Sequence, residues 1–166
     1  MPKVWLITGS SRGLGRALAE AVLTAGDKLV ATARNPEQLA DLVERFGDQV
    51  RAVALDVTNE QAAAHAVAVA TEAFGRLDVL ANNAGYGDIS PIEDTSLDEF
   101  RAQIEANLFG VINVAKAALP LMWEQGAGHI LQVSSIGCRI GPAGRGPYAA
   151  AKALKASPAR IASPLW

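Results

Sequence analysis

TGSSRGLG (residues 8–15) joins the apolar run VWLIT (residues 4–8) to a stretch in which apolar residues recur with helical period. A strand that passes through a glycine-rich turn into a helix is typical of nucleotide-binding α/β folds. Glycines there permit a tight turn, a close approach to a pyrophosphate and close packing of the helix. Glycines also end strands for purely structural reasons, so the inference rests on the place of this turn between strand and helix.

The rest of the sequence repeats this alternation of short apolar runs and longer helical stretches. Further runs predict strands at residues 28–33, 50–57, 77–82 and 129–135. Continuous apolar runs of this length are typical of buried parallel strands, and the stretches between them are typical of crossover helices. The pattern predicts one α/β domain with a parallel sheet.

Capping residues predict where two of the helices begin. Thr58 with Gln61 and Ser96 with Glu99 have the spacing of capping boxes. The second box opens a long helix with an apolar stripe of helical period. The residues of this predicted buried stripe include Phe100, Ile104, Leu108, Val111 and Ala115.

Composition favours a soluble globular domain. Half of the 166 residues are apolar, and 15 basic residues nearly balance 17 acidic ones. We find no basic stripe that would indicate nucleic acid or an anionic membrane surface, and no apolar run that approaches the ~18 residues of a membrane span. Cys138 is the only cysteine, which fits a reducing cytoplasm. His65 and His129 lack a metal-binding motif, so no metal site is predicted.

Two motifs in the expected order resemble those of the short-chain dehydrogenase/reductase family. The turn reads T-G-x-x-x-G-x-G at residues 8–15, and NNAG follows the fourth predicted strand at residues 82–85. The resemblance implies a Rossmann-like, doubly wound parallel sheet in a three-layer α/β/α domain over residues 1–154. It also implies a nicotinamide dinucleotide. The implied cofactor-binding residues are Gly9, Ser11, Arg12, Gly13, Leu14, Gly15, Arg34, Asp56, Val57, Asn83, Ala84, Gly85, Tyr148 and Lys152.

The end of the second predicted strand bears on the choice of cofactor. An acid there would accept the ribose hydroxyls of NAD, whereas a base would pair with the extra phosphate of NADP. Ala33 stands where NAD-preferring relatives carry Asp, Arg34 follows, and Arg12 lies in the glycine turn. NADP is therefore expected ahead of NAD, unless both arginines are solvated surface charges. By resemblance Asp56 accepts a hydrogen bond from the adenine amino group; alternatively it is a helix-capping carboxylate ahead of Thr58.

Tyr148 and Lys152 stand four residues apart, so one helix face can present both, with Cβ atoms about 5–6 Å apart. A neighbouring ammonium favours the phenolate, which makes Tyr148 a plausible general acid and base. The resemblance adds Ser135, at the end of the fifth predicted strand, as the hydroxyl that binds the substrate oxygen. It adds Asn107 as the holder of a water that links Lys152 to solvent. Ser134 is expected to point to the opposite face of that strand.

The tetrad Asn107, Ser135, Tyr148 and Lys152 implies hydride transfer between nicotinamide and a carbonyl or secondary alcohol, with a small-molecule substrate. The sequence after Lys152 departs from the family pattern, because residues 155–166 have neither helical nor strand period. We expect an atypical tail there, a sheet without the last strands of the family, and a shifted reading frame or premature stop. The family forms homo-oligomers, and this chain is not expected to complete their usual contacts.

Two hypotheses follow from these patterns. The first is an NADP-dependent oxidoreductase, which the complete tetrad supports. The second is a truncated, non-catalytic nucleotide-binding protein, which the missing family strands support.

Overall fold

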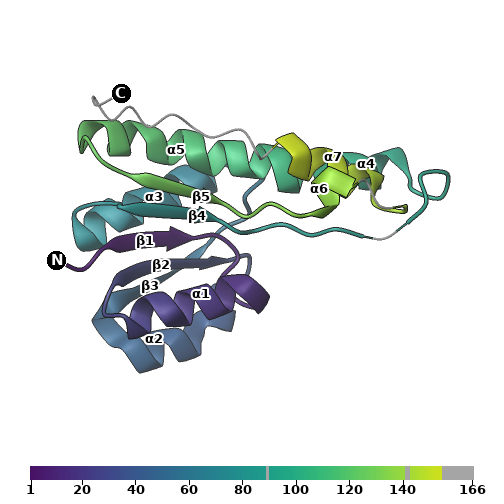
Figure 1. Cartoon of the computed structure of the whole chain (residues 1–166). Coiled ribbons are helices and arrows are strands. Elements are labelled where there is room, and N and C mark those ends of the chain that lie inside the picture. Colours follow the sequence, from purple (N-terminus) through teal and green to yellow (C-terminus); the bar gives the residue numbers. More distant parts are fainter. Residues whose placement is uncertain (89, 141–142, 155–166) are drawn as a thin grey trace.

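A computed structural model describes residues 1–88, 90–140 and 143–154, and the predicted tail at 155–166 lies outside the described residues. Five parallel strands form one sheet in the order β3-β2-β1-β4-β5 (Figure 1). The strands are β1 (Val4–Ile7), β2 (Lys28–Ala33), β3 (Val50–Ala54), β4 (Val79–Asn82) and β5 (His129–Gln132). The helices are α1 (Gly13–Thr24), η1 (Pro36–Leu39), α2 (Ala40–Phe46), η2 (Gly47–Gln49), α3 (Glu60–Phe74), α4 (Leu97–Ile104), the π-helical turn η3 (Glu105–Phe109), α5 (Gly110–Glu124), α6 (Gly137–Ile140) and α7 (Gly146–Leu154).

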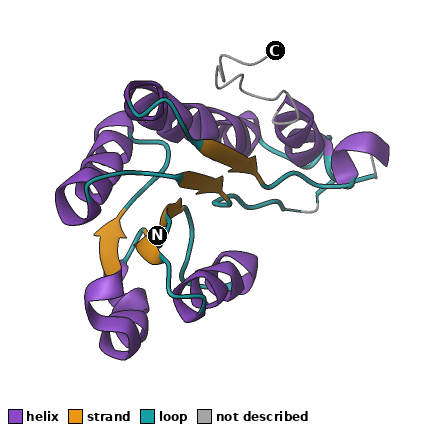
Figure 2. Cartoon of the chain, turned by 60° about the vertical axis from the view of Figure 1, so that its left-hand side comes forward, coloured by secondary structure: helices purple, strands orange, loops and turns teal. Residues whose placement is uncertain are grey.

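Helices cover both faces of the sheet (Figure 2). α1 and α2 pack on one face, and α3 and α5 pack on the other. Because side chains alternate along a strand, the neighbours Leu6 and Ile7 of β1 enter different hydrophobic cores. The doubly wound, three-layer arrangement predicted from the sequence is confirmed.

The strand order places a crevice at the carboxyl ends of β1 and β4. The chain builds the sheet outward from β1 through β2 and β3, and then returns to the other side of β1 for β4 and β5. Such a switch point is where open α/β sheets bind their ligands. The glycine turn after β1 and the NNAG segment after β4 both end there.

Several predicted boundaries are wrong. β1 ends at Ile7 and not at Thr8, β3 ends at Ala54 and not at Val57, and β4 begins at Val79 and not at Leu77. β5 ends at Gln132, so Ser135 follows the strand instead of ending it. The cap of α3 is Asn59, whose Oδ1 accepts from the Ala62 N–H at 2.9 Å, and not Thr58. The second capping box is confirmed, since Ser96 and Glu99 each accept the backbone N–H of the other at the start of α4.

The buried stripe of the long helix differs from the predicted one. Among the predicted residues only Val111 is buried. The π-helical turn η3 inserts an extra residue into the helical ladder, and this shifts the face that meets the core. The residues that are buried are Gln103, Asn107, Gly110, Val111, Val114, Ala118 and Met122.

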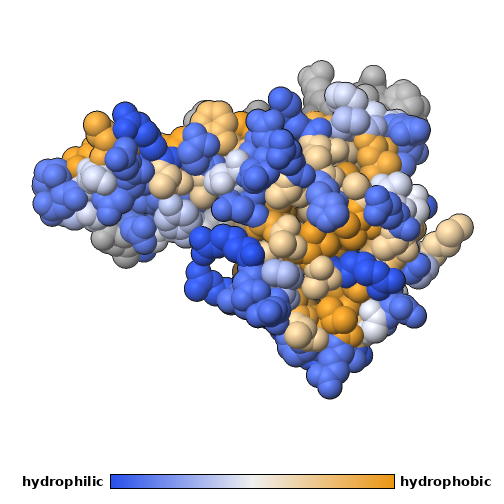
Figure 3. Space-filling view, turned by 180° about the vertical axis from the view of Figure 1, so that it is seen from behind, coloured by the Kyte–Doolittle hydropathy of each residue, from blue (hydrophilic) through white to orange (hydrophobic). Residues whose placement is uncertain are grey.

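The outer face of the same helix is apolar in places. Phe109, Ile112 and Trp123 are exposed there. Elsewhere, on the side of the molecule turned away from the viewer in Figure 1, an area of apolar side chains is bordered by charged ones (Figure 3). By length and composition alone, the continuous helix from Leu97 to Glu124 would be able to cross a membrane. Its Val114 and Ala118 pack with α3 in the core, as those of the core helix of a globular domain do.

Candidate active site

The glycine turn requires glycine for two different reasons. Gly9 and Gly13 have φ values of 71° and 57°, in the left-handed region that favours glycine. Gly15 is helical, but a Cβ there would collide with the Gly9 carbonyl oxygen and the Asn83 amide. Arg12 is the N-cap residue of α1, and its side chain makes no capping hydrogen bond. The first N–H groups of α1 are therefore available to an anionic ligand.

Thr8 joins the glycine turn to the NNAG segment. Its side chain is buried, and its Oγ1 accepts the N–H groups of Asn83 at 3.0 Å and Ala84 at 2.9 Å. The Asn83 amide donates in return to the carbonyl oxygens of Thr8 at 3.0 Å and Gly9 at 3.1 Å. The two motifs noted in the sequence thus form one hydrogen-bonded unit. The sequence motif contains Thr8, but nothing in its spacing indicated this bridging role.

A second pair of hydroxyls fixes the glycine turn against β2. Ser10 Oγ donates to the Ile7 carbonyl oxygen at 2.8 Å, and Thr32 Oγ1 donates to the same oxygen at 3.2 Å. The Ser10 N–H donates to the Thr32 carbonyl oxygen at 2.8 Å. Because Thr32 is held in this way, the end of β2 and the following Arg34 stand beside the turn that carries Arg12.

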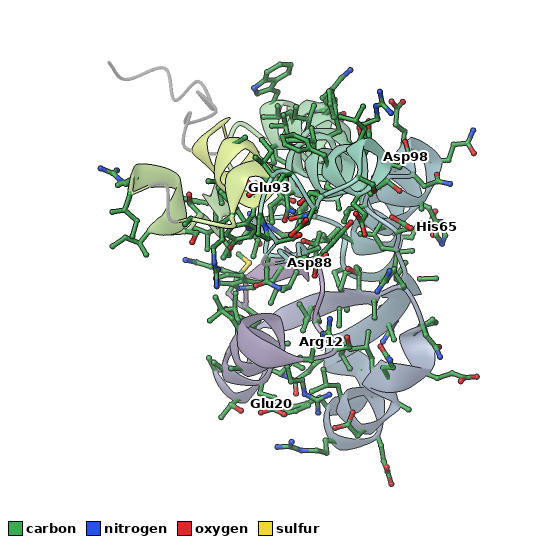
Figure 4. All side chains as sticks on the ribbon, turned by 90° about the vertical axis from the view of Figure 1, so that its right-hand side faces the viewer. Arg12, Glu20, His65, Asp88, Glu93 and Asp98 are labelled. Atoms are coloured by element: carbon green, nitrogen blue, oxygen red, sulfur yellow. The ribbon has the colours of Figure 1, made fainter. Side chains whose placement is uncertain are left out.

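Arg12 and Arg34 are both exposed at the carboxyl edge of the sheet. Figure 4 looks onto this edge and shows Arg12 at the start of α1. Neither guanidinium has a carboxylate partner among the described residues. Asp56 Oδ1 accepts from the N–H and the hydroxyl of Thr58 at 3.0 and 2.8 Å, so Asp56 caps the turn that precedes α3.

Arg16, just after the glycine turn, ties α1 to α2. Its guanidinium pairs with Glu20 one helical turn on and with Asp41 of α2. The hydrogen bond from Arg16 holds the pKa of Asp41 below its usual value. This exposed ion pair holds the helix that follows the glycine turn in place.

Tyr148 and Lys152 lie together on α7. The Lys152 Nζ is 5.6 Å from the centroid of the Tyr148 ring, and Lys152 is only 3% exposed. The ammonium donates to the Val133 carbonyl oxygen at 3.0 Å. A Cβ at Gly87 would fall 2.8 Å from Cγ of the Tyr148 ring, so the backbone after β4 lies directly against the tyrosine. The fold thus places Tyr148 and Lys152 next to each other, as their spacing in the sequence predicts.

Asn107 lies in the π-helical turn and is completely buried. Its amide donates to the carbonyl oxygens of Tyr86 at 2.6 Å and Gln103 at 3.0 Å, and its Oδ1 accepts the Tyr86 N–H at 3.2 Å. A Cβ at Gly85 would collide with the Asn107 side chain and come within 3.4 Å of the Lys152 Nζ. Asn107 therefore fixes the loop that passes Lys152. π-Helical turns occur frequently at functional sites.

These elements enclose a cavity of about 310 Å³ at the carboxyl edge of the sheet. Arg34 and Asp56 lie outside its lining, at the ends of β2 and β3. Val57 also lies outside it, and its carbonyl oxygen accepts from the Asn113 amide at 3.1 Å. The lining residues are Leu14, Asn83, Gly85, Tyr86, Gly87, Val133, Ser134, Arg145, Tyr148 and Lys152.

The cavity contains Ser134, whereas Ser135 is not among its lining residues. Ser134 Oγ donates to the Lys152 carbonyl oxygen at 3.3 Å. The expectation that Ser134 points away from the site relied on strand alternation, but both serines lie beyond β5, where alternation does not hold. Sequence analysis also missed Tyr86 and Arg145. The position of Arg145 three residues before Tyr148 was the available signal.

A parallel sheet of this order, with a glycine turn and a second motif at its switch point, is typical of dinucleotide-binding α/β proteins. The family model for short-chain dehydrogenases matches residues 3–157. The chain belongs to the short-chain dehydrogenase family.

Relatives agree with this family. An oxidoreductase of Botryotinia fuckeliana is 55% identical over 153 residues, which are 92% of this chain and 56% of that protein. An uncharacterised oxidoreductase of Staphylococcus aureus is 37% identical, over 81% of this chain and 58% of its own length. The crystal structure of a short-chain dehydrogenase from Streptomyces avermitilis superposes with a TM-score of 0.87 at 42% identity, covering 92% of this chain and 56% of that one. The chain spans somewhat more than half the length of these relatives.

Proposed function

We propose that this chain is an NADP-dependent oxidoreductase that transfers a hydride between nicotinamide and a carbonyl or secondary alcohol. One observation carries the proposal: Tyr148 and Lys152 face the same cavity as Leu14 of the glycine turn and Asn83 of the NNAG segment. A proton-transferring side chain and a dinucleotide-binding turn therefore open onto one space. Family membership supports the same reaction class.

The chain has the features that a dinucleotide requires. Glycines at positions 9, 13 and 15 leave the backbone of the turn bare for the approach of a pyrophosphate, and the N–H groups of α1 are uncapped by side chains. Two exposed arginines, Arg12 and Arg34, are available for a ribose phosphate, and Ala33 supplies no acid to repel it. Arginine binds phosphate by charge-assisted, bidentate hydrogen bonds. These features favour NADP over NAD.

In the proposed site the bound nicotinamide supplies or accepts the hydride, and the side chains move the proton and orient the substrate. Tyr148 gives its phenolic proton to a carbonyl oxygen, or takes one from an alcohol. Lys152, buried beside the ring, supplies the positive charge that stabilises the phenolate. Ser135 is proposed to hold the substrate oxygen, and Asn107 keeps the loop at Tyr86 in place beside Lys152.

We further propose that residues 1–154 act as one dinucleotide-binding domain in the cytoplasm. The single cysteine supports a reducing compartment. The cavity is of a size that suits a small-molecule substrate. The near balance of charges gives no support for a nucleic acid partner.

The test is NADPH oxidation, followed by absorbance, with a panel of ketones and aldehydes. Wild-type chain should oxidise NADPH only when a carbonyl compound is present. Tyr148→Phe removes the proton donor and should lower turnover ~10²–10⁴-fold. The same variant should bind NADPH with nearly unchanged affinity by calorimetry. NADPH binding without turnover of any carbonyl compound would favour the non-catalytic, nucleotide-binding alternative.

A further inference from the structure

Arg145 is a cation in the active-site cavity for which the proposed reaction has no use. The ionisable side chains of the cavity lining are Arg145, Lys152, Tyr86 and Tyr148, and no carboxylate lines the cavity. Lys152 already donates to the Val133 carbonyl oxygen. Arg145 is therefore the positive charge available to a molecule that enters beside Tyr148.

The guanidinium of Arg145 lacks a partner within the described part of the chain. Arg16, Arg45, Arg51, Arg76 and Arg101 each pair with a carboxylate there. Arg145 has no such ion pair, although it is partly buried. A partly buried charge without a partner is costly, and a ligand carboxylate would supply that partner.

The backbone around Arg145 is fixed. The Arg145 carbonyl oxygen accepts the Ala149 N–H at 2.8 Å, which makes Arg145 the residue that opens α7. The carbonyl oxygen of the preceding Gly144 accepts the Ser90 N–H at 2.9 Å. Tyr148 follows one helical turn later. Residues three apart on a helix are neighbours, so the guanidinium and the phenol reach the same small molecule.

We propose that Arg145 selects substrates that carry a carboxylate near the reacting carbonyl, that is, oxo acids and the corresponding hydroxy acids. This inference rests on the proposed oxidoreductase function. Arginine presents a planar fork of N–H donors that matches the two oxygens of a carboxylate. A single guanidinium matches one negative charge, which favours a carboxylate over a phosphate dianion. The methyl ester of the same oxo acid keeps the reacting carbonyl and lacks the charge.

The experiment compares 2-, 3- and 4-oxo carboxylates with their methyl esters, using NADPH as reductant. For at least one chain length, wild-type kcat/KM should be about tenfold or more higher for the acid, because a charge-assisted hydrogen bond distinguishes the two. Arg145→Met should remove this preference and leave the kcat/KM for the ester within about threefold of wild type. Arg145→Lys should restore part of it. Arg139→Met, which removes an exposed charge outside the cavity lining, is the matched control and should keep the preference.

Three results would overturn the inference while the oxidoreductase function stands. They are an equal kcat/KM for acids and esters in wild type, an equal loss of kcat/KM for both in Arg145→Met, and a preference for a phosphorylated ketone. A binding measurement covers the case in which no carbonyl compound is reduced. Calorimetry with 4-oxopentanoate and NADP⁺-loaded chain should then show binding that Arg145→Met weakens about tenfold or more. In that case the oxidoreductase proposal fails and carboxylate recognition stands. If 4-oxopentanoate does not bind, both the oxidoreductase proposal and the proposal of carboxylate recognition fail.

Discussion

Replacing Thr8 by valine should weaken the link between the two motifs of the dinucleotide site. The Thr8 hydroxyl accepts two N–H groups, from Asn83 and Ala84, and Thr8 is only 1% exposed. Valine has nearly the same shape but offers no acceptor, so the Ala84 N–H loses its partner, whereas the Asn83 N–H keeps the Ala81 carbonyl oxygen at 3.0 Å. A buried donor left unsatisfied costs about 1–3 kcal/mol, and Thr8→Val should therefore lower the free energy of unfolding by about 1–3 kcal/mol.

Thr8→Ser is the matched control, because it keeps the oxygen and loses one methyl group, which costs about 1 kcal/mol. Urea unfolding followed by circular dichroism would give both free energies, and titration with NADPH would give both affinities. Thr8→Val should be the less stable of the two variants. It should also bind NADPH more weakly, since the NNAG segment loses its hydrogen bond from Ala84 to Thr8, although the Asn83 amide still donates to the Gly9 carbonyl oxygen. If the two variants were equally stable, the bridging role of the hydroxyl would be refuted.

Three further outcomes are expected. Arg34→Ala and Arg12→Ala should each weaken NADPH by about 1.5–3 kcal/mol and leave NADH nearly unchanged by calorimetry, and equal losses for both cofactors would contradict the phosphate assignment. Ser135→Ala should lower turnover ~10²–10³-fold and Ser134→Ala much less, whereas the reverse order would move the role to the serine that lines the cavity. Asp41→Asn should destabilise the chain above the ordinary aspartate pKa of about 3.9. Because Arg16 lowers the pKa of Asp41 in the folded chain, wild type loses this contribution as the pH falls through that lower value, and the two unfolding curves should converge there.

Local patterns in the sequence were enough to predict most of the fold. β2 has the bounds that its apolar run predicts, and Ser96 and Glu99 form the expected capping box. Both signals depend only on residues close together in the chain. Tyr148 and Lys152 are neighbours for the same reason, since one helix carries them.

Features that depend on contacts between distant residues could not be predicted. The π-helical turn that carries Asn107 changes the phase of the long helix, and the Asn107 amide bonds the backbone of Tyr86, 21 residues away in the chain. Thr8 can bond the backbone of the NNAG segment only because β1 and β4 are adjacent in the sheet. Ser134 lines the cavity because β5 ends at Gln132, where its pairing with β4 stops.

Deuterium transfer from NADPH labelled at nicotinamide C4 tests the proposed oxidoreductase function in a single measurement. A carbonyl compound is incubated with each of the two stereospecifically labelled cofactors and the chain, and the alcohol product is analysed by mass spectrometry. The proposed mechanism predicts one deuterium on the carbinol carbon from one of the two cofactors with wild type, and a rate of incorporation ~10²–10⁴-fold lower with Tyr148→Phe. Product without deuterium from either cofactor, or equal incorporation rates for wild type and Tyr148→Phe, would contradict that mechanism.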